Sequence, residues 1–100
     1  MGNCLRPIQQ SRGQRVIWQV EVEPATSWHA GVWLDMILPW NNRLEAAYQY
    51  TRSRPHMCHM VDLDAESSWA EYEVDLRSYV QTSCYSGTER RVRTVLAPLS

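Results

Sequence analysis

The sequence contains no lysine and no phenylalanine. All 10 basic residues are therefore arginine, and tryptophan and tyrosine supply the whole aromatic content of 10%. A guanidinium group is a rigid fork of donors that fits a phosphate or a carboxylate with two parallel hydrogen bonds, whereas a lysine acts as a point charge. Any phosphate site in this chain must therefore be built from guanidinium groups.

Cysteine and glycine are also scarce. Cys4, Cys58 and Cys84 are odd in number and widely spaced, which argues against a disulfide framework and favours a reducing compartment, either cytoplasm or nucleus. The 4 glycines are not clustered, so there is no glycine-rich phosphate loop. No apolar run approaches the roughly 20 residues that span a bilayer, and no signal peptide is visible.

Neither charge sign dominates the chain. The 100 residues carry a net charge of −1, with 44% apolar and 21% charged residues, which is typical of one globular domain rather than a disordered segment. A general nucleic-acid binder is usually strongly basic, so this class is disfavoured.

Residues 1–15 are polar and lack periodicity, and we expect them to form a flexible arm before a domain at 16–97. Gly2 and Cys4 are candidate acylation sites, because a myristoyl and a palmitoyl chain together anchor a protein stably to a membrane. The myristoylation signal prefers Ser or Thr where Arg6 stands, and a plain disordered N-terminus is the alternative.

Alternating apolar residues predict a small antiparallel α+β domain. Val16, Trp18 and Val20 share one face of the first predicted strand, and Gln19 and Glu21 share the other. The second strand is expected to return antiparallel to the first. Strands are predicted at 16–22, 32–36, 56–61, 69–76, 80–85 and 90–96.

A single helix is predicted after Pro39. Asn41 or Asn42 is a candidate N-cap, and Leu44, Ala47 and Tyr48 have the spacing of a buried helical face. The helix should be short, because residues 50–51 are poor helix formers and a proline follows at 55.

The segment from Tyr72 to Arg93 combines the groups that one ligand would need. Tyr72 lies on an alternating strand, Gln81 carries an amide, and Arg90 begins an arginine cluster after a Ser86–Gly87 turn. A tyrosine ring can stack on a base, an amide can both accept and donate hydrogen bonds, and a guanidinium can hold a phosphate. If they act together, these side chains should converge on one open cavity.

Five segments, taken in order, resemble the motifs of the WWE domain family, and the resemblance covers roughly residues 16–95. They are W-Q-V-E at 18–21, W-L-D-M at 33–36, L-E-A-A-Y at 44–48, Y-E-V-D-L-R-S-Y-V-Q at 72–81 and G-T-E-R-R-V-R at 87–93.

The resemblance implies a six-stranded half-barrel packed on one helix. It also implies a non-catalytic module, needing no cofactor, that binds the iso-ADP-ribose or ADP-ribose units of poly(ADP-ribose), as in ubiquitin ligases and ADP-ribosyltransferases. In such domains adenine enters a pocket at the open end of the half-barrel. By position, the resemblance makes Tyr72, Gln81, Arg90 and Trp33 candidate ligand contacts, and a monomer is expected. Gln19 and Arg91 complete the candidate set.

The sequence departs from the family pattern at several positions. Val20 and Met36 stand where the motifs have aromatics, Tyr79 replaces a methionine, and Gln19 occupies a position that is aromatic in strong poly(ADP-ribose) binders. Six carboxylates between 62 and 75 would repel a phosphate nearby. A protein-interaction or adaptor domain with a degenerate pocket is therefore the alternative.

The histidines and cysteines near residue 58 raise the question of a metal site or a catalytic nucleophile. On a strand, His56 and Cys58 would share one face while His59 points to the other, and a fourth ligand would have to come from Cys84 or the acidic loop. No carboxylate is placed to orient a Cys–His pair for nucleophilic attack. We therefore expect neither a metal site nor an enzyme.

Overall fold

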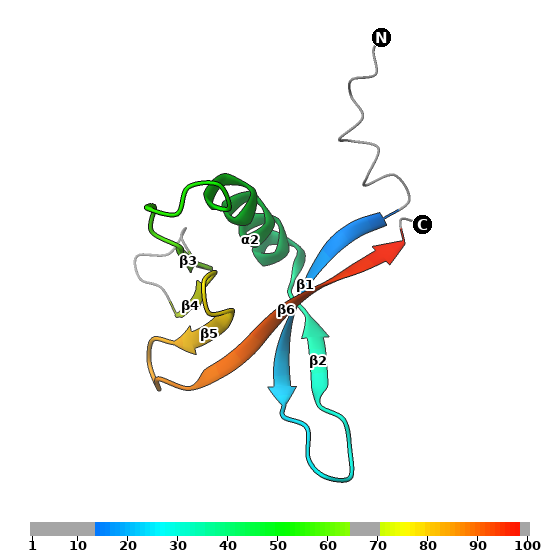
Figure 1. Cartoon of the computed structure of the whole chain (residues 1–100). Coiled ribbons are helices and arrows are strands. Elements are labelled where there is room, and N and C mark those ends of the chain that lie inside the picture. Colours follow the sequence, from blue (N-terminus) through cyan, green and yellow to red (C-terminus); the bar gives the residue numbers. More distant parts are fainter. Residues whose placement is uncertain (1–13, 65–70, 99–100) are drawn as a thin grey trace.

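The structure, a computed structural model, describes residues 14–64 and 71–98. Within these ranges the chain is an α+β domain with an open, six-stranded antiparallel sheet and one helix (Figure 1). The strands follow the order β2-β1-β6-β5-β4-β3 across the sheet. The elements are β1 (Gln14–Glu23), β2 (Val32–Asp35), α2 (Leu38–Thr51), β3 (Met60–Asp62), β4 (Tyr72–Asp75), β5 (Val80–Ser83) and β6 (Glu89–Pro98).

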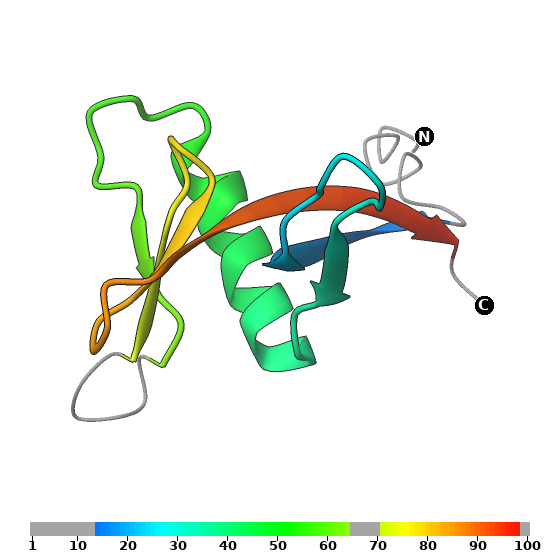
Figure 2. The ribbon, with the colours of Figure 1, turned by 90° about the horizontal axis from the view of Figure 1, so that it is seen from below.

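Strand β6 joins the two halves of the sheet. Residues 92–98 pair with β1, from Val20↔Val92 to Gln14↔Pro98. Residues 89–91 pair instead with β5, where Gln81 lies opposite Arg90. Figure 2 shows β6 running across the whole sheet, with β1 and β2 beside one half and β3, β4 and β5 beside the other. Strand β6 therefore changes its pairing partner from β5 to β1 between Arg91 and Val92.

The hydrophobic core lies between α2 and the sheet (Figure 1). Trp18 and Leu44 are completely buried, as is Val74. The Trp18 ring stacks on Tyr79, with 5.7 Å between centroids, and meets the edge of Tyr48 at 6.0 Å. Its indole N–H donates to Glu45 Oε1 at 2.9 Å, so the polar handle of this buried ring is satisfied.

Asn41 joins α2 to β1 where β2 has ended. Met36 N still bonds Trp18 O at 2.8 Å, but the chain then turns into the helix. The Asn41 side chain continues the hydrogen bonding along this edge of β1, a seam between α2 and β1. Its Oδ1 accepts from Trp18 N at 2.6 Å, and its Nδ2 donates to Val16 O at 3.2 Å. The amide of a buried helical residue thus replaces the missing strand.

The structure corrects the prediction for the start of the helix. Helix α2 begins at Leu38 after Ile37, which makes no side-chain capping bond, and Pro39 occupies the first turn. Asn41 and Asn42 both lie inside the helix, so neither is the N-cap. The helix has 14 residues and continues through Thr51, whose hydroxyl donates to Ala47 O. The predicted buried face is confirmed, since Leu44, Ala47 and Tyr48 all belong to the core or pack against it.

The predicted strands are found with different bounds. Strand β1 begins at Gln14, so Gln14 and Arg15 belong to the sheet and not to the expected arm. The third strand is only Met60–Asp62, because residues 52–58 form turns. This loop is tied down by Arg77, whose guanidinium donates to the carbonyl of Pro55. The antiparallel return of β2 is confirmed.

The described part of the chain contains no helix with the length and apolar character needed to cross a bilayer.

Candidate functional site

The pairing of β4, β5 and β6 brings Tyr72, Gln81 and Arg90 to one face of the sheet. Tyr72 lies opposite Ser83, and Gln81 lies opposite both Val74 on β4 and Arg90 on β6. Directly paired residues share a face, and so do residues two apart on one strand. Because Val74 belongs to the core, the three predicted residues lie on the core side of the sheet.

These three residues line one cavity of about 140 Å³. Its other lining residues carry hydroxyl groups and come from the end of β5 and the following turn. At the cavity, the core side of the sheet changes from apolar side chains, such as Val74, to polar ones. The lining residues are Tyr72, Gln81, Ser83, Ser86, Thr88 and Arg90.

Gln81 has an unused acceptor. The residue is only 7% exposed, and its Oε1 is buried without a hydrogen-bond partner among the residues that the structure describes. Leaving a buried acceptor unpaired costs about 1–3 kcal/mol. A ligand or an ordered water that donates to this oxygen would remove the cost.

Within the described part of the chain, Arg90 is held in place by one of its donors. Its Nη1 donates to Val22 O at 2.8 Å, across the point where β1 and β6 stop pairing. A guanidinium has five N–H donors, so this bond orients the group and leaves further donors available. Arg90 is itself exposed, as an anion-binding group at a cavity mouth must be.

The hydroxyl groups of Ser83, Ser86 and Thr88 were not predicted as part of the site. Ser83 Oγ accepts from the backbone N–H groups of Tyr85 and Ser86, and Ser86 Oγ donates to Thr88 Oγ1 at 2.9 Å. Gly87 has a φ of 74°, which permits the tight return into β6. The Ser-Gly-Thr turn was recognisable from sequence, but the direction of its hydroxyls depends on the hairpin geometry.

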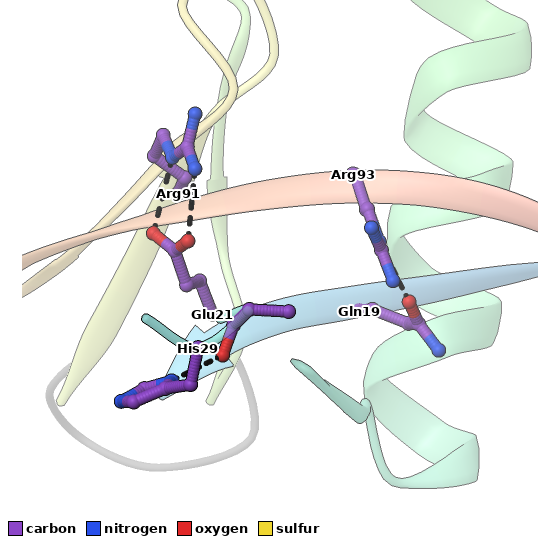
Figure 3. Close-up of polar contacts among 6 residues, drawn as sticks. Gln19, Glu21, His29, Arg91 and Arg93 are labelled. Atoms are coloured by element: carbon purple, nitrogen blue, oxygen red, sulfur yellow. Dashed lines mark hydrogen bonds and ion pairs between the residues drawn. The ribbon is translucent and has the colours of Figure 1, made fainter. Parts of the chain in front are cut away.

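Trp33, Gln19 and Arg91 lie on the opposite face, contrary to expectation. Trp33 pairs with Glu21, and Gln19 pairs with Arg93, so all of these side chains alternate away from Trp18 and the core. Trp33 therefore lines neither the cavity nor its floor. Figure 3 shows two pairs of residues on this face, Arg91 with Glu21 and Arg93 with Gln19.

On this second face, two arginines surround the Trp33 ring. The guanidinium carbon of Arg93 lies 4.2 Å from the ring centroid and that of Arg91 lies 5.7 Å from it, which are cation–π distances. Arg93 Nε also donates to Gln19 Oε1 at 2.8 Å, and Gln19 Nε2 donates to Asp35 Oδ1 at 2.8 Å. The side chains of Gln19 and Arg91 thus contact other residues of the chain.

Glu21 and Arg91 form a bidentate ion pair. Arg91 Nε and Nη2 donate to the two carboxylate oxygens at 3.0 and 2.8 Å, and Glu21 is only 7% exposed. The Arg91 hydrogen bonds lower the pKa of Glu21 below its ordinary value of 4.5, against the opposing effect of burial. The same bonds raise the pKa of Arg91.

We expect this pair to make stability depend on acid pH. Because the pKa of Glu21 is lowered on folding, its contribution is complete above pH 4.5 and is lost as the pH falls through the lowered pKa. Glu21→Gln should therefore be less stable than wild type at pH 7, and the difference should disappear in acid. Urea denaturation across this pH range measures it.

Glu23→Gln is the matched control, because Glu23 is an exposed carboxylate on the same strand. It should change stability little at any pH. A Glu21→Gln deficit that persisted undiminished in acid would show that packing, and not charge, stabilises this position.

The cysteines and histidines of the described residues form neither a cation site nor a disulfide. Among residues 14–64 and 71–98, no group of at least three His, Cys, Asp or Glu side chains is arranged to hold a metal ion. Cys58 and Cys84 are both free. The pKa of the Cys84 thiol is raised, first by burial and then by the carboxylates of Glu73, Asp62 and Asp64.

The candidate acylation sites Gly2 and Cys4 lie outside the described residues, and their modification stays a prediction.

No model of a known protein family matches the chain, and neither a curated protein nor a solved structure is detectably similar to it.

Proposed function

We propose that this chain is a non-catalytic binding module for the ADP-ribose or iso-ADP-ribose unit of poly(ADP-ribose). The observation that carries the proposal is the convergence of Tyr72, Gln81 and Arg90 on one cavity, with a buried acceptor of Gln81 unpaired. The order of the WWE-like motifs supports it, as do the open antiparallel sheet and the single described helix. By the same resemblance, its cellular setting would be a ubiquitin ligase or an ADP-ribosyltransferase.

The size of the cavity limits how much of the ligand is enclosed. Pockets that hold whole drug-sized ligands measure roughly 300–1,000 Å³, whereas this cavity measures about 140 Å³. One group of an ADP-ribose unit would therefore enter, and the remainder would lie along the surface. Arg90 stands where the enclosed and exposed parts of such a ligand would meet.

Calorimetric titration with iso-ADP-ribose, ADP-ribose and ATP tests the proposal. Arg90→Ala is expected to weaken binding of the ADP-ribose ligands about 10- to 100-fold, because it removes charge-assisted hydrogen bonds to phosphate. Arg93→Ala is the matched control, since Arg93 lies on the same strand but on the opposite face. Its affinity should equal that of wild type.

Two results would contradict the proposal. One is an absence of binding, or only millimolar binding, for all of these ligands. The other is equal affinity for wild type and Arg90→Ala.

The second candidate is a protein-interaction domain with the same fold. It is favoured by the carboxylates of Glu73, Asp62 and Asp64, which lie close enough to Cys84 to raise its pKa. Glu73 lies between Tyr72 and Val74 on β4 and so points to the face opposite the cavity. Its charge, with that of its neighbour Asp62, opposes an incoming phosphate through the field at this end of the sheet and not by contact. This candidate predicts that a basic protein partner is retained by the immobilised chain and that added ADP-ribose does not release it.

A further inference from the structure

Several side chains around the cavity have hydrogen-bond donors that would suit a ligand rich in acceptors. Ser83 Oγ accepts two backbone N–H bonds, and its own hydrogen is not used in them. Thr88 Oγ1 accepts from Ser86, so its hydrogen is also available. Together with the remaining N–H groups of Arg90, these donors suit the oxygens of a phosphate.

Gln81 differs from these groups, because its side-chain oxygen offers the ligand an acceptor and not a donor. Its buried Oε1 is an acceptor without a partner among the described residues, so a ligand that also supplies a donor would satisfy it. The phosphate dianion of a monoester has no hydrogen to donate, but a sugar phosphate carries hydroxyl groups beside its phosphate. A phosphorylated sugar, or a similar hydroxyl-bearing phosphate ester, meets both requirements with separate groups.

The side chains that line the cavity are less suited to a purine base. Enclosed bases are held by stacking on aromatic or apolar surfaces, and Tyr72 is the one aromatic residue among the described residues that line the cavity. Its ring is already packed against Trp40, with 5.8 Å between centroids and 56° between planes. The other lining side chains are an amide, three hydroxyls and a guanidinium.

We propose that the cavity is a phosphoribosyl site, which encloses a ribose phosphate and leaves the purine outside. The inference rests on the proposed function, because the ligand is a part of the ADP-ribose unit. It departs from the arrangement that the WWE resemblance implies, in which adenine enters the pocket. It makes recognition independent of the base.

Calorimetry with ribose 5-phosphate, ADP-ribose, GDP-ribose, adenosine and inorganic phosphate tests this assignment. Ribose 5-phosphate should bind, ADP-ribose and GDP-ribose should bind with equal affinity, and adenosine should not bind. Inorganic phosphate should bind more weakly than ribose 5-phosphate, because it has no sugar hydroxyl that can donate to Gln81 while the phosphate oxygens stay on the donors around the cavity.

The outcomes separate this inference from the proposed function. If ADP-ribose and adenosine bind but ribose 5-phosphate does not, the phosphoribosyl site is wrong and the proposed function stands. If ribose 5-phosphate binds but ADP-ribose does not, the proposed function is wrong, and the cavity takes a sugar phosphate that is not part of an ADP-ribose unit. If nothing binds, both fall. Equal affinity for inorganic phosphate and ribose 5-phosphate would also overturn the inference, since the cavity would then recognise only an anion.

Gln81→Met supplies a readout that a purely structural role would not produce. Removing an unpaired buried amide should leave the stability unchanged or raise it, while the affinity for ribose 5-phosphate should fall about tenfold. Thr88→Val should also weaken binding, and Thr94→Val, at an exposed threonine further along β6, is its control. Wild-type affinity in Gln81→Met would overturn the assignment.

Discussion

Replacing Trp18 with alanine is expected to lower the free energy of unfolding by about 3–5 kcal/mol. The side chain is completely buried, stacks on Tyr79 and contacts the edge of Tyr48. The substitution would leave a large cavity and would also deprive Glu45 of its indole donor. Small domains are stable by only about 5–15 kcal/mol, so this variant should be largely unfolded at moderate urea concentrations.

Chemical denaturation followed by circular dichroism measures this loss. Trp28→Ala is the control, because Trp28 is 86% exposed in the loop between β1 and β2. It should change stability by no more than about 0.5 kcal/mol. Similar losses in the two variants would contradict the core position of Trp18.

Replacing Asn41 with leucine should destabilise the protein by about 2–5 kcal/mol. The leucine cannot bond Trp18 N or Val16 O, which would leave a buried backbone donor and a partly buried acceptor unpaired, at about 1–3 kcal/mol for a fully buried group. This loss should appear in equilibrium denaturation. Hydrogen exchange should also accelerate at the Trp18 amide, because Asn41 is the acceptor that protects it.

The neighbouring asparagine gives a matched control. Asn42 is exposed on the same helix, and Asn42→Leu should change stability by no more than about 0.5 kcal/mol. If Asn41→Leu were as stable as this control, the seam between α2 and β1 would not depend on the amide.

Alternation and turn residues were sufficient to predict most of the secondary structure. The β1–β2 hairpin and the buried face of α2 were recognisable because each has a clear period in the sequence. The third strand was predicted to begin too early, at residue 56, because 57, 58 and 60 are apolar. These residues do not reveal that Arg77 bonds the loop before the strand. The role of Asn41 was missed for the same reason, since its partners are more than 20 residues away.

The candidate site was predictable only where it depended on one hairpin and its neighbour. Tyr72, Gln81 and Arg90 lie on three consecutive strands, so local pairing is enough to bring them together. The position of Trp33 depends instead on its register against β1, and pairing with Glu21 turns it to the opposite face. A family motif specifies the residue type, whereas the register decides which side of the sheet it reaches.

The position of β6 also constrains the order in which the protein can assemble. Strands β3, β4 and β5 can pair locally, and so can β1 and β2, but β6 lies between these groups in the sheet. During synthesis, β1 therefore waits with one edge unpaired until residues 92–98 have left the ribosome. Contacts between residues so distant in sequence slow folding, and an unpaired strand is a template for association between chains. Nascent chains that stop before β6 should accordingly be the form of this protein that most needs chaperones.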